Sequence, residues 1–286
     1  LCVSPGGGTG FVGRALTQLL RSRGHPVTHV SRQGGQDRIS WEELSHSGLP
    51  LCDAVVNLAG ENVLNPFHRW GDAFRREVIS SRVETTKTLA KATAAAEQPP
   101  RAWVLVTGVG IALPSATLCC SYEGVPGGVI KLIESLNGLG WKGPLRPSSV
   151  VLGRDGGAIS QMLLPFRLGL GGPLGSGLQP FPWIHIRDLS GIVCHALEKE
   201  SVQGILNGVA PSSHATSNGT FAQELAAALG RPALVPVPAW AVRAVFGAER
   251  AVMLLEGQRV LPKRTLESGY HFIFPDLAAA LKDVVA

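Results

Sequence analysis

The sequence predicts an α/β fold with a doubly wound parallel sheet and a smaller mixed lobe toward the C-terminus. Over residues 1–110, short and continuously apolar stretches alternate with amphipathic ones. Parallel strands that are covered by helices on both faces have this pattern, because neither side of the strand meets water. A glycine cluster joins the first strand to the first helix, and 45% of the 286 residues are hydrophobic, which is enough for a large core.

The N-terminal third gives its elements in order. The glycines at 6–13 lead into a helix whose apolar face includes Leu16 and Leu20, and Gly24 follows where a helix C-terminus favours glycine. Further along, apolar runs predict strands and a long polar stretch predicts a helix. The strands are expected at 26–30, 53–60 and 104–107, and the helix at 70–96.

The alternation fails between residues 111 and 149, where prolines and glycines are frequent and only 129–137 has a helical pattern. Regular structure is expected again beyond this stretch, with strands at 150–153 and 183–186 and helices at 188–199, 221–229, 239–246 and 277–285. The glycine- and proline-rich residues 169–182 fit either a lid over a substrate or a long connection.

Composition argues against several classes of protein. The 26 basic and 21 acidic residues give a net charge of +5, and the basic residues form no long run, which argues against a nucleic-acid surface. No apolar run reaches about 18 residues, the length needed to span a membrane. The five cysteines contain no C-x-x-C pair, so we expect a reducing compartment and no bound metal. We expect an intracellular, cytoplasmic protein and leave a mitochondrial or nuclear location open.

A glycine motif carries the first functional prediction. Residues 8–13 fit G-x-G-x-x-G between a predicted strand and a predicted helix, which is the context of a dinucleotide-binding Rossmann loop. Glycines let backbone N–H groups approach a pyrophosphate, and the helix N-terminus adds partial positive charge. A side chain at Gly10 would occupy the space of the pyrophosphate and oppose a positive φ. The alternative is a glycine-rich turn without a ligand.

The end of the second strand indicates which dinucleotide is bound. NAD sites usually have an acidic residue there, which accepts from the ribose 2′-hydroxyl. This chain has Ser31 and Arg32 instead. An arginine can pair bidentately with a 2′-phosphate, so we expect NADP; the alternative is an exposed arginine that follows a strand.

Several motifs resemble the atypical or extended short-chain dehydrogenase/reductases. They are GGTGFVG at 7–13, NLAGE at 57–61, Ser81-Arg82, WIHIRDL at 183–189 and NGVAP at 207–211. The C-terminal stretches 231–240, 257–264 and 269–272 narrow the resemblance to the epimerase family proteins, the subgroup 39U member 1 proteins and their bacterial cell-division-inhibitor-like relatives. The resemblance covers about residues 3–110 and 150–286. It implies a Rossmann fold and NADP(H) binding.

The resemblance also implies roles for individual residues. Ser31 and Arg32 would hold the adenosine phosphate, Leu58 and Ala59 would line the nucleotide, Glu77 and Arg82 would reach its polar edge, and Val151 would lie near the nicotinamide. The full set expected to bind the cofactor is Gly7, Thr9, Gly10, Phe11, Val12, Gly13, Ser31, Arg32, Leu58, Ala59, Gly60, Glu77, Arg82, Thr107 and Val151. Glu77 and Arg82 are five residues apart and share no clean helix face, so solvated helix charges are the alternative for both.

The catalytic residues of the superfamily are not recognisable. Its reductases use a Ser or Thr with a Tyr-x-x-x-Lys helix, in which Tyr is the acid. Here Tyr122 and Tyr270 are followed four residues later by Pro126 and Phe274. We therefore leave the catalytic residues unknown, with Thr107, Tyr122 and His185 as candidates. For His185 and Asp188 the alternative is structural, with Asp188 capping a helix and His185 filling the junction between the lobes.

The sequence supports two hypotheses of function. The first is an NADP(H)-binding oxidoreductase or epimerase-like protein that acts on an unknown small molecule; the second is a catalytically silent NADP(H)-binding sensor or interaction protein. We expect residues 1–155, joined by 178–205, to hold the dinucleotide, and residues 156–177 and 206–286 to form the substrate side. Substrate, reaction direction and oligomeric state are left open.

Overall fold

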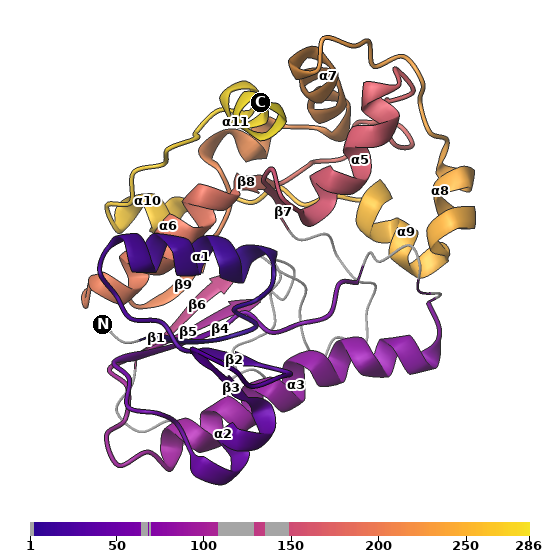
Figure 1. Cartoon of the computed structure of the whole chain (residues 1–286). Coiled ribbons are helices and arrows are strands. Elements are labelled where there is room, and N and C mark those ends of the chain that lie inside the picture. Colours follow the sequence, from indigo (N-terminus) through magenta and orange to yellow (C-terminus); the bar gives the residue numbers. More distant parts are fainter. Residues whose placement is uncertain (1–2, 64–67, 69, 108–128, 135–148) are drawn as a thin grey trace.

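The larger lobe is a seven-stranded parallel sheet (Figure 1). The computed structural model describes residues 3–63, 68, 70–107, 129–134 and 149–286. The strands are β1 Val3–Gly6, β2 His29–Ser31, β3 Arg38–Ser40, β4 Ala54–Asn57, β5 Ala102–Thr107, β6 Val129–Glu134 and β9 Gly204–Asn207. They lie in the order β3-β2-β1-β4-β5-β6-β9, and every adjacent pair is parallel. The predicted doubly wound sheet is confirmed.

Helices cover both faces of this sheet. The helices α1 (Phe11–Ser22) and α6 (Ile186–Glu198) pack on one face, where Leu16 and Leu189 join Val56 and Val104 in a continuous core. On the other face lie α2 (Trp41–Ser47) and α3 (Asp72–Ala94), and their side chains pack on alternate strand residues such as Trp103. Consecutive strand residues therefore enter different cores, which explains the unbroken apolar runs.

Local signals set the ends of these helices. α1 is followed by Gly24, which has a φ of +79° and whose N–H donates to the carbonyl of Arg21 in the last turn. α2 begins with a capping box, in which the N–H of Glu43 donates to Oγ of Ser40 and the N–H of Ser40 donates to the Glu43 carboxylate. Both caps satisfy backbone groups that a helix end would otherwise leave without partners.

The smaller lobe has a core of its own. It consists of a two-stranded parallel sheet, β7 (Val150–Leu152) and β8 (Trp183–His185), together with helices from the C-terminal half. Trp183, Phe166, Phe221 and Leu281 form its centre. The helices of the C-terminal half are α5 Gly157–Arg167, α7 Asn218–Ala228, α8 Ala239–Phe246, α9 Ala248–Leu255, α10 Lys263–Glu267 and α11 Leu277–Val285, with a short 3-10 helix at Pro211–Ala215. Of these, α10 lies against β9 of the larger sheet.

The connection at 169–182 is fixed by hydrogen bonds to the rest of this lobe. The N–H of Gly175 donates to the carbonyl of Val237, and the N–H of Phe181 donates to that of Thr216. Nε2 of Gln179, a buried side chain, donates to the carbonyl oxygens of Leu174 and Leu254. These contacts favour the long connection over a lid.

Two segments differ from the predicted secondary structure. Residues 129–134, expected to begin a helix, are strand β6, which pairs with β5 and β9. The run V-I-K-L-I is rich in β-branched residues, and an apolar run this short does not distinguish strand from helix by period. Residues 157–167, for which no secondary structure was predicted, form α5, which contains Gly157 and Pro165.

A small cluster joins the two lobes. Phe74 and Val78 of α3 pack against Met253 of α9, and all three are buried. Beside them, Nε1 of Trp70 donates to the Glu249 carboxylate at 2.5 Å, and Arg75 pairs with the same carboxylate. No helix among the described residues is long and apolar enough to cross a lipid bilayer.

Candidate cofactor site

The glycine loop lies at the carboxyl edge of the sheet and is packed too tightly for side chains. A Cβ on Gly7 would lie 2.9 Å from the backbone of Leu58 and Ala59, and one on Gly13 would lie 2.6 Å from the carbonyl oxygen of Gly7. Gly7 also has a φ of +77°, a conformation that favours glycine. The loop after β1 and the loop after β4 are therefore in direct backbone contact.

Gly10 has a different role. Its φ is −72°, so the expected positive φ is wrong for this residue. Among the described residues, a Cβ on Gly10 would come close only to the carbonyl oxygen of Gly7, at 3.3 Å, so Gly10 is less enclosed than Gly7 and Gly13. The first turn of α1 contains no acidic residue, and no side chain in the part of the chain that the structure describes caps it. Its first N–H groups are thus available to an anion that approaches over Gly10.

The loop after β4 is held by a buried side chain that the sequence analysis did not single out. Asn57 is 1% exposed, its amide donates to Oγ1 of Thr86 at 2.8 Å, and its Oδ1 accepts from the N–H of Ala59 at 3.0 Å. It therefore fixes Leu58 and Ala59 beside Gly7. Asn57 begins the NLAGE motif at 57–61, but the predicted cofactor-binding residues from this motif were only Leu58, Ala59 and Gly60.

The structure brings Arg82 to this loop and leaves Glu77 in solvent. The Arg82 guanidinium donates to the carbonyl of Glu61 at 2.9 Å, and a Cβ on Gly60 would touch it. Burial lowers the pKa of Arg82, which the charge of Glu61 opposes, and arginine stays charged nonetheless. Glu77 is exposed on α3. Arg82 thus places positive charge beside the turn at Gly60.

Ser31 and Arg32 lie at the end of β2, on the same edge. Ser31 is buried and its Oγ donates to the carbonyl of Gln33 at 2.5 Å, which shapes the turn that follows. Arg32 is exposed and makes no ion pair within the described part of the chain. No acidic side chain occupies the position after Ser31 where an NAD site usually has one.

The remaining candidates are spread over the fold. Thr107 is the last residue of β5, on the carboxyl edge. Val151, in the middle of β7, is 7% exposed and packs in the core beside Ile184. Tyr122 lies outside the described residues. The described residues contain no cluster of three or more His, Cys, Asp or Glu placed to hold a metal ion.

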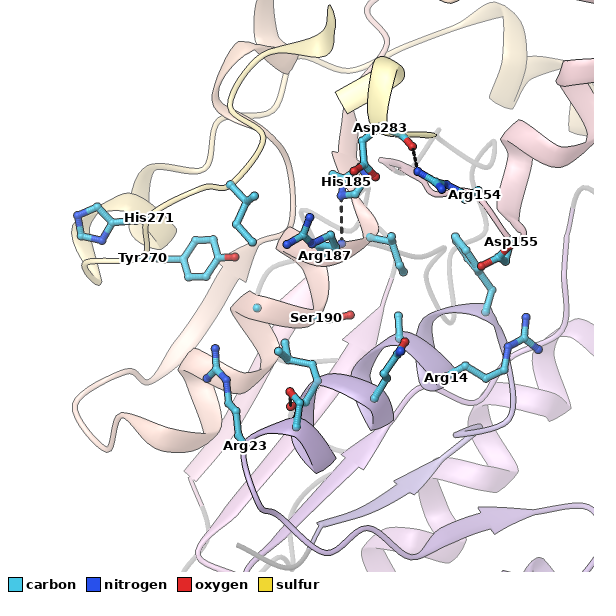
Figure 2. Close-up of a pocket in the computed structure, with 18 residues that line it drawn as sticks. Arg14, Arg23, Arg154, Asp155, His185, Arg187, Ser190, Tyr270, His271 and Asp283 are labelled. Atoms are coloured by element: carbon cyan, nitrogen blue, oxygen red, sulfur yellow. Dashed lines mark hydrogen bonds and ion pairs between the residues drawn. The ribbon is translucent and has the colours of Figure 1, made fainter. Parts of the chain in front are cut away.

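His185 and Asp188 have structural partners, but the cap is not the residue expected. His185 is the N-cap of α6: its Nδ1 accepts from the N–H of Arg187, and its Nε2 lies 3.3 Å from Asp283 (Figure 2). Burial lowers the pKa of His185. The Asp188 carboxylate instead accepts from the N–H groups of Ile273 and Phe274, at 2.7 and 2.9 Å. Asp188 therefore ties α6 to the C-terminal segment.

Comparison with known proteins extends over the whole chain. The chain is 61% identical to the epimerase family protein SDR39U1 of Bos taurus and 59% identical to that of Homo sapiens, with 98% of both chains covered in each case. The crystal structure of human SDR39U1 (isoform 2) with NADPH matches with 54% identity, a TM-score of 0.89 and 99% of both chains covered. A domain of unknown function, DUF1731, matches residues 237–284.

These matches confirm the resemblance on which the sequence analysis relied. The matched C-terminal domain overlaps the stretches that narrowed the resemblance to the epimerase family proteins. The identity over the full length is also far above what a shared fold alone produces. The chain belongs to the epimerase family that includes the SDR39U1 proteins.

Proposed function

We propose that this chain binds NADP(H) in the crevice at the carboxyl edge of the sheet. The observation that carries the proposal is that, among the described residues, only the Gly7 carbonyl oxygen lies close to Gly10, at a helix N-terminus that none of their side chains caps. At Gly7 and Gly13, by contrast, neighbouring backbone atoms occupy the space that a side chain would take. A phosphate can therefore come close at Gly10. The human relative solved with NADPH supports this assignment.

Different residues at the crevice would bind different parts of NADP(H). Backbone N–H groups of Phe11 and Val12 would hold the pyrophosphate, and Arg32 with Ser31 would hold the 2′-phosphate. Leu58, Ala59 and Gly60 would line the nucleotide on a loop that Asn57 and Arg82 keep in place. NADP(H), when bound, donates or accepts a hydride. Glu77, Thr107 and Val151 belong to the proposed set by resemblance.

We further propose that the protein is an oxidoreductase or epimerase-like enzyme for a small molecule. The division into a nucleotide side (1–155 with 178–205) and a substrate side (156–177 and 206–286) is part of this proposal. A second candidate is a catalytically silent NADP(H)-binding protein, and the absence of Tyr-x-x-x-Lys from the sequence favours it. An intact loop and a complete second lobe favour the enzyme.

Two measurements test these proposals in turn. Titration of the protein with NADPH, followed by nucleotide fluorescence, should show saturable binding; an absence of binding would overturn the cofactor assignment. Turnover of NADPH with a panel of aldehydes and ketones then separates the oxidoreductase from the silent binding protein, because only the oxidoreductase consumes NADPH.

A further inference from the structure

A cleft separate from the crevice lies between α1, α6 and the C-terminal segment. Its volume is about 820 Å³, within the range of small-molecule sites. One wall is the face of α1 from Phe11 to Arg23, and the other includes Arg187, Ser190 and Ile273. Phe11 is the one residue proposed for the cofactor that also lines this cleft.

The cleft has more positive than negative side chains. Four arginines and two aspartates line it. Arg23 is neutralised by Glu198 at 2.6 Å, but Arg14, Arg154 and Arg187 make no ion pair within the described ranges. Their contacts are with neutral groups: Arg14 donates to the carbonyl of Thr9, Arg154 donates to that of Asp283, and Arg187 lies over the ring of Phe274. Positive charge is thus left for an anion.

Ser190 gives an independent sign of a ligand. It is 1% exposed and lines the cleft one turn after Arg187 on α6, and its Oγ has no hydrogen-bond partner among the described residues. A buried hydroxyl without a partner is costly, and a helical serine can usually bond a carbonyl one turn back. Figure 2 shows Arg187 and Ser190 along α6, with Arg187 beside His185 and with Arg23 and Arg14 lower on opposite sides.

We propose that this cleft binds a small organic anion, a carboxylate or phosphate on an apolar body, at a site distinct from the cofactor crevice. Arg187 and Ser190 hold the anionic group, and Arg14 and Arg154 add positive charge. The apolar body lies against Phe11 and Leu19, which are partly exposed, and against Ile273, which is exposed.

The test is calorimetric titration of the protein in excess NADPH, which keeps phosphates out of the crevice. Phenyl phosphate and benzoate are the two anionic probes, and phenol is the neutral control with the same ring. We expect at least one anion to bind and phenol to bind at least about tenfold more weakly. Comparison of the two anions distinguishes a phosphate site from a carboxylate site.

Variants then test the residues. Arg187→Gln should weaken the anion about ten- to a hundredfold, as the loss of a charge-assisted hydrogen bond does. Arg243→Gln, an exposed arginine on α8 away from the cleft, should bind like the wild type. Ser190→Ala should also weaken the anion, yet leave the Tm of the ligand-free protein unchanged or higher, because it removes an unpartnered hydroxyl.

The proposal fails if neither anion binds at millimolar concentration, or if Arg187→Gln binds as tightly as Arg243→Gln. It fails equally if Ser190→Ala lowers the Tm without changing the affinity, since Ser190 would then serve only the packing of α6. Retained binding in the presence and absence of NADPH supports a site separate from the crevice; loss of all binding when NADPH is added would place the anion in the crevice instead.

Discussion

The individual glycines in the loop after β1 have different structural roles, although the sequence motif does not distinguish them. Gly7 requires a positive φ and touches the loop after β4, and Gly13 lets α1 approach the loop backbone. Gly10 has an ordinary φ and, among the described residues, only the carbonyl oxygen of Gly7 lies close to it. Two of these glycines therefore serve the fold, and the third leaves space for a ligand.

Substitution at Gly10 and Gly13 should separate these roles. Gly10→Val should abolish NADPH binding while the protein still folds, because its side chain enters the space that the pyrophosphate would use and approaches the described backbone only at the Gly7 carbonyl oxygen. Gly13→Ala should destabilise the fold by about 1–3 kcal/mol or more, because the neighbours within 2.6 Å are backbone atoms. Thermal unfolding and NADPH titration of both variants check this. Normal NADPH affinity in Gly10→Val would make the loop a structural turn only.

Arg32 should decide the preference between the two dinucleotides. One charge-assisted hydrogen bond to the 2′-phosphate is worth about 1.5–3 kcal/mol, or about ten- to a hundredfold in affinity. Arg32→Ala should lose this factor for NADPH and leave NADH affinity unchanged. Arg38→Ala, an exposed arginine on β3, is the matched control. Equal affinities of the wild type for NADPH and NADH would contradict the role of Arg32.

For single residues, the sequence predicted the glycines whose backbone faces the cofactor better than the side chains, such as Asn57, that hold the loops in place. A glycine motif has a fixed spacing, so it could be read directly. The role of Asn57 depends on Thr86, which lies 29 residues later on α3, and no local sequence pattern predicts that contact. The φ of Gly10 likewise depends on how the whole loop packs against β4.

Among the elements, strands and helices with a long or clear pattern were predicted well. α8 and α11 have the predicted bounds, and α3 differs by two residues at each end. β6 was mistaken for a helix because it is short, mostly apolar and without a regular alternation of apolar and polar residues, as is common in a strand that is paired on both sides. α5 was missed because Gly157 and Pro165 interrupt its pattern, while burial of Ile159 and Phe166 outweighs them.

The attachment of α6 to the C-terminal segment should depend on Asp188. Its carboxylate is fully buried and accepts from two backbone N–H groups and from the Tyr270 hydroxyl, at 3.1 Å. Asp188→Asn keeps the shape but replaces one acceptor with a donor. We expect it to lower the free energy of unfolding by at least about 1.5–3 kcal/mol in urea denaturation.

Asp155→Asn provides the control for this prediction. Asp155 is exposed in the turn between β7 and α5, and such surface changes usually stay within about 0.5 kcal/mol. If Asp188→Asn were as stable as Asp155→Asn, the carboxylate would not be what ties the segment to α6.

For the whole molecule, the apolar part of the contact between α3 and α9 should matter more than its ion pair. The Arg75 and Glu249 side chains are 45% and 55% exposed, so solvent screens their attraction. Met253→Ala, at a buried position, should cost about 2–5 kcal/mol. Glu249→Gln should change stability little. Urea denaturation of both variants compares the two losses in the free energy of unfolding. A larger loss for Glu249→Gln than for Met253→Ala would contradict this prediction.

The final prediction concerns catalysis, where the sequence offers no proton donor of the kind the superfamily uses. Of the two tyrosines, Tyr270 is committed to Asp188, and burial together with that carboxylate raises its pKa well above the usual range, so it cannot serve as the acid. His185 is likewise occupied as the cap of α6. Tyr122 is thereby the one tyrosine left as a candidate, without a lysine four residues on.

Hydride transfer to a carbonyl leaves an alkoxide that needs a proton, and loss of a positioned acid costs about 10²–10⁴-fold in rate. We therefore expect at most weak NADPH oxidation across a panel of aldehydes and ketones. Tyr122→Phe should leave that weak rate unchanged, and NADPH titration should confirm that its cofactor still binds. Robust turnover that Tyr122→Phe removes would contradict this account and make Tyr122 the acid. Robust turnover that survives the change but is lost in His185→Gln would assign the proton to His185, against its role as a cap alone.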